Sequence, residues 1–283
     1  MTATAPARLL ISHITLRGPE LAQLYALIAV SPAATLDDLR AKLCPAGVGT
    51  APDDLADAPL REALSFLGIA GLVTANGRPR RYTATPRLRA VPFPLLLTHH
   101  VATHPDERQR AIAFVHRQLV ADDTLAITPQ ALRDQQERGP LRDLFAWTGE
   151  KVTLWAHLAA FLGLIRRVER ATELLIVPSL ALTRHALSWA RTAATDATAL
   201  DALLRVIDSH LFACFTARGR IHRGLTQTLL ALESRGQLHM THHADAAHSL
   251  LLGERRVSTV ALLEARLCRV SPYNVDDAAS ERR

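Results

Sequence analysis

One pattern recurs along this chain and constrains its fold more than any other feature. An apolar helical segment ends near a glycine and leads directly into a short strand and a polar or basic hairpin. The three copies span residues 60–84, 154–177 and 225–252. Glycine is the residue that most often ends a helix, and short strands separated by turn residues indicate a hairpin. The repetition predicts two or three small domains of one type, which suits a chain of 283 residues.

The three copies differ in clarity. In the first, Asn76-Gly77 is a strong hairpin signal, because both central residues of a type I′ turn need positive φ. The third is the least regular. After Gly236, its returning strand is expected near residues 248–252 or, as a second choice, near residues 256–262. The third hairpin is therefore the least secure of the three.

Helices are expected before each hairpin. In the first unit, an apolar stripe predicts a helix over residues 19–30, and Thr35 is a candidate N-cap for a short helix to Leu43. A polar loop follows, and a third helix begins at Pro59, a residue favoured in the first helical turn. The order is helix, helix, helix, hairpin.

The later units repeat this order less regularly. The helices expected in the second unit span residues 106–120, 128–137 and 151–162, with Thr128 as the N-cap of the second. A connecting helix over residues 180–194 is expected to lead to a third unit, which opens with a long helix over residues 198–215.

Domain boundaries follow from the breaks between these elements. Val91-Pro92-Phe93-Pro94 interrupts the helical pattern and predicts a linker or domain crossover, and His99, His100 and His104 are expected in a linker. We expect a first domain over residues 1–90 and a second over 91–180. A third domain or helical cap is expected over residues 181–270, and a disordered tail over 271–283.

The order of elements resembles the winged-helix superfamily over most of the chain. The resemblance rests on the pattern of three helices and a hairpin rather than on a diagnostic motif. It implies a mainly α fold with small β-hairpins, of the α+β class, built from tandem winged-helix domains. It also implies units that commonly bind DNA and just as often serve as protein–protein modules.

Composition limits the class of protein. A hydrophobic content of 48% is enough for real cores, and no run of about 18 uncharged apolar residues suggests a membrane span. Cys44, Cys214 and Cys268 are widely spaced and form no CxxC pair, so a disulfide framework is not expected. We therefore expect a soluble, cytoplasmic protein with no membrane partner.

The charge balance favours an anionic partner. The net charge is +6, and only Lys42 and Lys151 are lysines among 33 basic residues. This arginine bias is typical of a GC-rich genome, but the positive excess still places nucleic acid first among anionic partners.

Nine residues are candidates for contact with nucleic acid. Arginines suit phosphates because the planar guanidinium can bridge two oxygens. In winged helices the third helix enters the major groove and the hairpin, or wing, contacts backbone or minor groove. The candidates lie on the first hairpin, the second hairpin and the start of the last helix: Arg78, Arg80, Arg81, Arg166, Arg167, Arg218, Arg220, Arg223 and Gln227.

The three units differ in the residues that they offer for contact with DNA bases and phosphates. Acidic residues before and within the third helix of the first unit disfavour base contact there. In the second unit, His157 and the flanking arginines could face DNA, whereas Trp155 is interpreted as a core residue. In the third, arginines at a helix start predict a phosphate site, and Gln227 could read adenine.

No enzymatic site is predicted. The chain lacks the common phosphate-binding, dinucleotide-binding, zinc-protease and serine-hydrolase motifs. The densest group of metal-ligand types, His239, His242, His243, Asp245 and His248, has no supporting cysteine and is interpreted as a solvated hairpin. We expect no enzyme activity, no cofactor and no metal.

Three functions remain open. The first is a non-enzymatic accessory or regulatory protein that binds double-stranded DNA within a bacterial DNA-handling or antiviral defence complex. The second is a protein–protein scaffold, like the tandem winged-helix subunits of condensin-type complexes. The third is a plasmid or phage replication initiator. Protein partners in a larger complex are expected in the first two cases, and a homodimer is left open.

Overall fold

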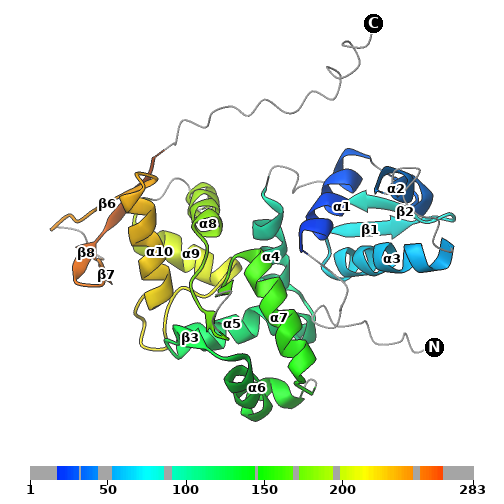
Figure 1. Ribbon diagram of the computed structural model, residues 1–283. Coiled ribbons are helices and arrows are strands. Elements are labelled where there is room, and N and C mark those ends of the chain that lie inside the picture. The colour runs from blue at the N-terminus through cyan, green and yellow to red at the C-terminus, as the bar shows by residue number, and fades with distance from the viewer. Residues whose placement is uncertain are drawn as a thin grey trace, which may run out of the picture.

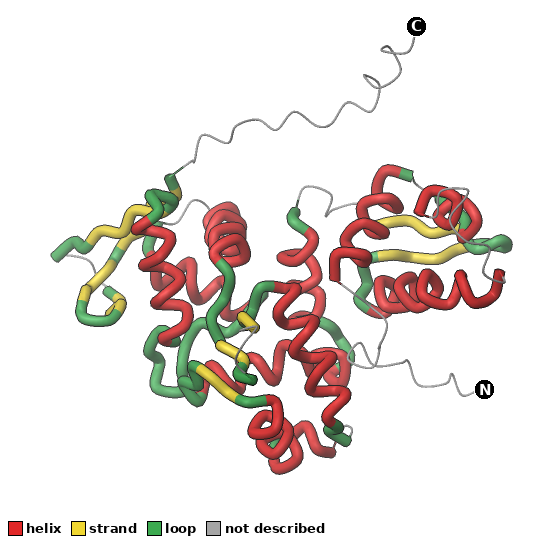
Figure 2. Tube along the Cα trace, viewed as in Figure 1, coloured by secondary structure: helices red, strands yellow, loops and turns green. Residues whose placement is uncertain are grey.

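The computed structural model describes residues 18–31, 33–43, 53–85, 91–143, 146–167, 172–193, 198–244 and 249–263. It is mainly helical with small antiparallel strand pairs, which confirms the predicted α+β class. Figures 1 and 2 show three groups of elements arranged side by side along the molecule. The tail predicted at residues 271–283 lies outside the described residues, as do residues 1–17, Cys44 and Cys268.

The first group contains the elements predicted for it. These are α1 (Gly18–Val30), α2 (Leu36–Leu43), α3 (Asp53–Ile69), β1 (Val73–Asn76) and β2 (Arg81–Ala84). The strands pair antiparallel, from Val73 opposite Ala84 to Asn76 opposite Arg81. The predicted start of the third helix was wrong, because α3 begins at Asp53 and Pro59 lies inside it. Pro59 has no backbone N–H, so the helix continues through it with one hydrogen bond fewer.

The second group has the same order of elements. It comprises α5 (Ala111–Ala121), β3 (Ala126–Ile127), α6 (Pro129–Arg138), α7 (Gly149–Leu162), β4 (Arg166–Arg167) and β5 (Leu174–Leu175). The Thr128 hydroxyl caps α6 by accepting from the Ala131 N–H, as predicted. A 3₁₀ turn, η3 (Glu107–Arg110), replaces the predicted first turn of α5, and a second, η4 (Pro140–Asp143), follows α6.

The third group is built around α8 (Leu180–Ala193), α9 (Leu200–His210) and α10 (Arg223–Ser234). Prediction treated α8 as a connection, but it packs against both α9 and α10 and is the first helix of this group. The long helix expected to residue 215 ends at His210, because the backbone leaves helical geometry at Leu211 (φ −123°, ψ −77°).

The third hairpin follows the second-choice prediction. Strand β6 (Leu238–Thr241) pairs with β9 (Thr259–Leu262), and the favoured return near residues 248–252 was wrong. Residues there form β7 (Leu250–Leu252), which pairs with β8 (Arg255–Val257) in a separate small hairpin. Gly253 has a φ of +63° in the turn between them, a conformation that glycine adopts without strain.

Each group is closed by one further backbone pairing. The residue or strand just before the second helix pairs antiparallel with the last strand of the hairpin. The three pairs are Ala34 with Tyr82, β3 with β5, and Ala199 with Thr259. In the second group this gives a three-stranded sheet in the order β3-β5-β4. All three groups therefore share an order of helix, short strand, helix, helix and hairpin.

The predicted linker was wrong, because residues 93–103 form a helix, α4 (Phe93–Thr103). Pro94 lies in its first turn, where a missing N–H breaks no helical hydrogen bond. Leu95, Leu96 and Leu97 are all buried, and α4 packs against α5, α7, α8 and α9. His99 and His100 therefore lie on a helix, and α4 joins the second group to the third.

The second and third groups meet closely at the start of α10. A methyl group at Gly224 would lie 2.0 Å from the Ile176 carbonyl oxygen. One turn later, the buried Thr228 hydroxyl donates to the Pro178 carbonyl at 2.8 Å. The segment after β5 thus contacts α10 through its backbone.

We expect Gly224→Ala to lower the free energy of unfolding by about 2 kcal/mol, because the new methyl group would overlap backbone that cannot easily move. Urea denaturation measures the change. Gly149→Ala is the matched control, since nothing lies within 4 Å of a methyl group there, and it should change stability by less than about 0.5 kcal/mol. Equal stability of the two variants would contradict this close contact.

Candidate nucleic-acid interface

The first hairpin exposes two arginines at its turn. Arg78 and Arg80 lie between β1 and β2, are exposed, and make no ion pair with other described residues. Arg81 differs, because its Nη1 donates to the Ala33 carbonyl at 3.4 Å and its charge helps to lower the pKa of Asp38, after the larger effect of hydrogen bonds from Thr35. Arg78 and Arg80 are therefore the freer cations of this hairpin.

The second hairpin places its arginines beside the third helix of its group. Arg166 and Arg167 form β4, an outer strand of the sheet, and both are exposed without an ion pair to other described residues. The pKa of His157 on α7 is lowered by partial burial and then by the nearby Arg167 charge. Helix α7 and strand β4 thus contribute to one surface. Arg170 lies outside the described residues.

Trp155 is a core residue, as predicted. Its side chain is 0% exposed, and its indole N–H donates to the Ile112 carbonyl at 3.2 Å. The exposed positions of α7 are instead Glu150, Thr153 and His157. Of the side chains considered as base readers on this helix, Thr153 and His157 remain accessible.

A tight basic turn joins α9 to α10. Phe215 and Ile221 form a β-bridge, and Arg218 and Arg220 project from the turn between them as exposed side chains. The backbone is fixed by hydrogen bonds from the Thr216 N–H to the Arg220 carbonyl (2.8 Å) and from the Gly219 N–H back to Thr216 (2.9 Å). Neither arginine makes an ion pair with another described residue.

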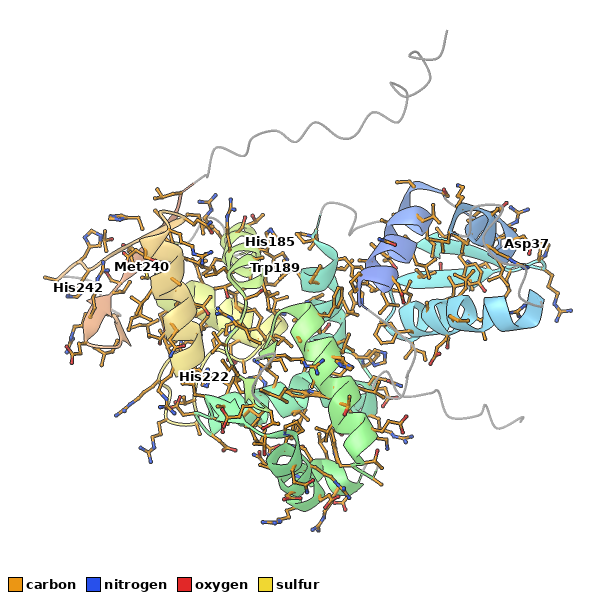
Figure 3. The ribbon with its side chains drawn as sticks, in the orientation of Figure 1. Asp37, His185, Trp189, His222, Met240 and His242 are labelled. Atoms are coloured by element: carbon orange, nitrogen blue, oxygen red, sulfur yellow. The ribbon has the colours of Figure 1, made fainter. Side chains whose placement is uncertain are left out.

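The start of α10 differs from the predicted phosphate site. Arg223 is bound to Asp123, with Nε 3.1 Å from a carboxylate oxygen and Nη2 2.9 Å from the Asp123 carbonyl. His222 caps the helix: its Nδ1 accepts from the Gly224 N–H, so its Nε2–H donates to the Thr124 carbonyl at 3.0 Å. Figure 3 shows His222 at the lower end of α10. The protein's own groups thus occupy the position expected for an anion.

Gln227 is the accessible polar side chain further along α10. It is exposed one turn after Arg223 and makes no hydrogen bond to other described residues. The neighbouring Thr228 is fully buried and bonded to backbone, so it is unavailable for base contact. The exposed stripe of the helix continues through Leu230 and Ser234.

The predicted arginines do not form one cluster. Figure 1 shows the β1–β2 hairpin at one end of the molecule and β7–β8 at the other. The basic turn lies near the second group, because the Ala217 N–H donates to the Ala121 carbonyl at 2.9 Å. The structure therefore presents separate basic segments along its length.

Histidines do not assemble a metal site in the part of the chain that is described. No group of three or more His, Cys, Asp or Glu side chains is placed there to hold a metal ion. His239, His242 and His243 are described, and all three are exposed; Asp245 and His248 lie outside the described residues.

No family model matches this chain, and no curated protein or solved structure matches it. Among the described helices, none is long and apolar enough to cross a membrane. The function is therefore inferred from the chemistry of the exposed residues.

Two buried histidines predict acid sensitivity. Burial lowers the pKa of His116 to about 3 and also lowers the pKa of His222. The unfolded chain protonates His116 below about pH 6.5, whereas the folded protein keeps it neutral, so stability is full above that pH and is lost as the pH falls toward 3. Between pH 7 and pH 5, His116 alone should remove about 2 kcal/mol.

Denaturation of His116→Leu across this pH range tests the assignment. The variant should lose about 2 kcal/mol of the pH dependence, whatever its stability at pH 7. His239→Gln, at an exposed position, should keep the full dependence. Identical pH profiles for His116→Leu and the unmodified protein would show that His116 is not held neutral by the fold.

Proposed function

We propose that the three groups are winged-helix domains and that the chain binds double-stranded DNA as a non-enzymatic accessory or regulatory protein. The shared order of helix, short strand, helix, helix and hairpin supports the domain assignment. In such domains the hairpin and the third helix both face the duplex. The exposed arginines lie on or beside these elements.

One observation carries the proposal. Two hairpins and the turn before α10 expose arginines that make no ion pair within the described chain: Arg78, Arg80, Arg166, Arg167, Arg218 and Arg220. Some other arginines are paired with nearby carboxylates, as in Arg117–Asp208 and Arg255–Glu233. Arg110, Arg138, Arg235 and Arg256 are also exposed and make no ion pair with a described residue, so the proposal rests on the position of the six arginines as well as on their free charge. Unpaired guanidinium groups suit phosphate oxygens, and their binding releases counterions from the duplex.

Backbone contact dominates this mode of binding. The helices that could enter a groove offer few base-reading groups, chiefly Gln227 on α10 and Thr153 and His157 on α7. Phosphate contacts position a protein without reading sequence. We therefore expect affinity for duplex DNA in general, with any preference added by α10.

The direct test measures binding of the full chain to random and genomic duplexes over a salt series. Sub-micromolar binding at low salt that weakens steeply as salt rises supports the proposal. Absence of binding at low salt would overturn it.

Paired substitutions should locate the interface. Arg78→Gln with Arg80→Gln, and separately Arg166→Gln with Arg167→Gln, should each weaken binding and flatten the slope of log K against log salt by up to about 2. Arg184→Gln with Arg191→Gln on α8 removes the same charge from another surface and should leave the slope unchanged. If the double substitution in one hairpin leaves the slope unchanged, that hairpin is excluded from the interface.

A second candidate is a protein–protein scaffold, and a groove in the first group favours it. The groove runs between α2, α3 and the β1–β2 hairpin. Leu36, Leu64 and Tyr82 contribute apolar lining. The charged residues that line it are Asp37, Arg61 and Arg80. Salt-insensitive capture of a polypeptide by a chain that fails to bind duplex DNA would support the scaffold over the first proposal.

A further inference from the structure

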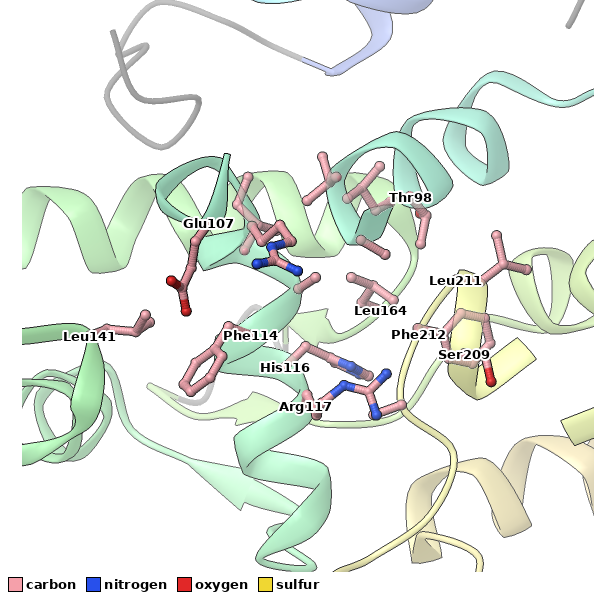
Figure 4. A pocket seen from close by; sticks show the side chains of 17 residues that line it. Thr98, Glu107, Phe114, His116, Arg117, Leu141, Leu164, Ser209, Leu211 and Phe212 are labelled. Atoms are coloured by element: carbon pink, nitrogen blue, oxygen red, sulfur yellow. The ribbon is translucent and has the colours of Figure 1, made fainter. Parts of the chain in front are cut away.

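A cavity of about 310 Å³ lies where the second and third groups meet. Its wall is formed by α4, η3, α5, η4, α7, the end of α9 and the segment that follows α9. Figure 4 shows Phe114, Leu164 and Phe212 around this space. Leu164 and Phe212 are 2% and 3% exposed, so the wall is firm and largely apolar. Its volume falls at the lower end of the range for small-molecule sites, about 300–1,000 Å³.

Two opposite charges line the cavity from one short turn. Glu107 and Arg110 both belong to η3, and both are exposed. They make no ion pair with each other or with another described residue. Arg117 also lines the cavity, but its charge is matched by Asp208 at 2.8 Å. Among the described residues that line the cavity, Arg110 is the cation and Glu107 the anion without an ion pair, and the rest of the lining is apolar apart from Arg117, Thr98, Ser209 and the neutral His116.

We propose that this cavity binds a small zwitterion with an apolar side chain, of the class of the aliphatic and aromatic α-amino acids. The Arg110 guanidinium donates to the ligand carboxylate, and the Glu107 carboxylate accepts from its ammonium group. The apolar side chain lies against Phe114 and Leu164. At about 30 Å³ per water, the cavity has the volume of about ten waters, which suits a molecule the size of leucine.

Charge complementarity selects this class over its alternatives. A purely apolar ligand would cover both charges without pairing either, which costs free energy. A simple carboxylate would pair with Arg110 but bring a second negative charge close to Glu107. A zwitterion satisfies both groups. The inference does not depend on DNA binding, because it rests on a different part of the surface.

Thermal unfolding of the full chain with each standard L-amino acid tests the proposal, followed by calorimetric titration. At about one hundred times the Kd, an apolar amino acid such as leucine should raise Tm by about 5 °C or more, and serine and lysine should have little effect. N-acetyl-leucinamide lacks both charges, and 4-methylpentanoate lacks the ammonium group; both should bind at least tenfold more weakly than leucine.

Substitutions at two exposed residues test whether leucine binds in the cavity. Arg110→Gln and Glu107→Gln should each weaken leucine binding at least tenfold. Arg218→Gln, at a residue that does not line the cavity, should bind like the unmodified protein. The proposal is overturned if no amino acid raises Tm, if 4-methylpentanoate binds as tightly as leucine, or if both cavity variants bind leucine normally.

Discussion

The architecture depends on a backbone pairing that recurs three times: the segment before the second helix pairs with the last strand of the hairpin. A two-stranded hairpin alone is only marginally stable in water. The added segment ties that hairpin to the loop between the first and second helices. In the first group this is the hydrogen bond from the Tyr82 N–H to the Ala34 carbonyl, at 2.8 Å. The pairing fixes each hairpin next to its third helix, so that helix and hairpin side chains can act on one ligand.

Short sequence signals were sufficient to locate turns and helix caps, which depend on residues close together in the sequence. Asn76-Gly77 predicted the place of the first hairpin but not its turn type. Asn76 ends β1 and has no positive φ, whereas Gly77, at a φ of +81°, opens a longer loop that reaches to Arg81. Thr128 was identified as a cap because its hydroxyl can reach an N–H three residues later. Helix α4 could not be found in this way. It is covered by α5, α7, α8 and α9, so its apolar residues Leu95 to Leu97 show no amphipathic stripe, and two prolines near its start suggested a break.

The candidate nucleic-acid interface was likewise predictable only where it depends on residues that are close in the sequence. The sequence identifies arginines in turns and hairpins, and the structure places Arg78, Arg166 and Arg218 on exposed segments. It could not show that Arg223 is already bound to Asp123, because that pair joins residues a hundred positions apart in different groups. The cavity was missed for a similar reason. Its wall is assembled from several distant elements, and no short motif records that they meet.

Helix α4 connects the interface between the second and third groups to the cavity. The helix packs on both groups and lines the cavity through Thr98 and Val101. The basic turn before α10 belongs to one of these groups, and strand β4 with its two arginines belongs to the other. Under the two proposals, a ligand in the cavity would change the affinity of these arginines for DNA only if it bound two arrangements of the groups with different affinity. Rigid contacts such as Gly224 against Ile176 disfavour a large rearrangement. Any coupling must therefore act through small shifts of α4 or through stiffening of the interface, and it should be modest.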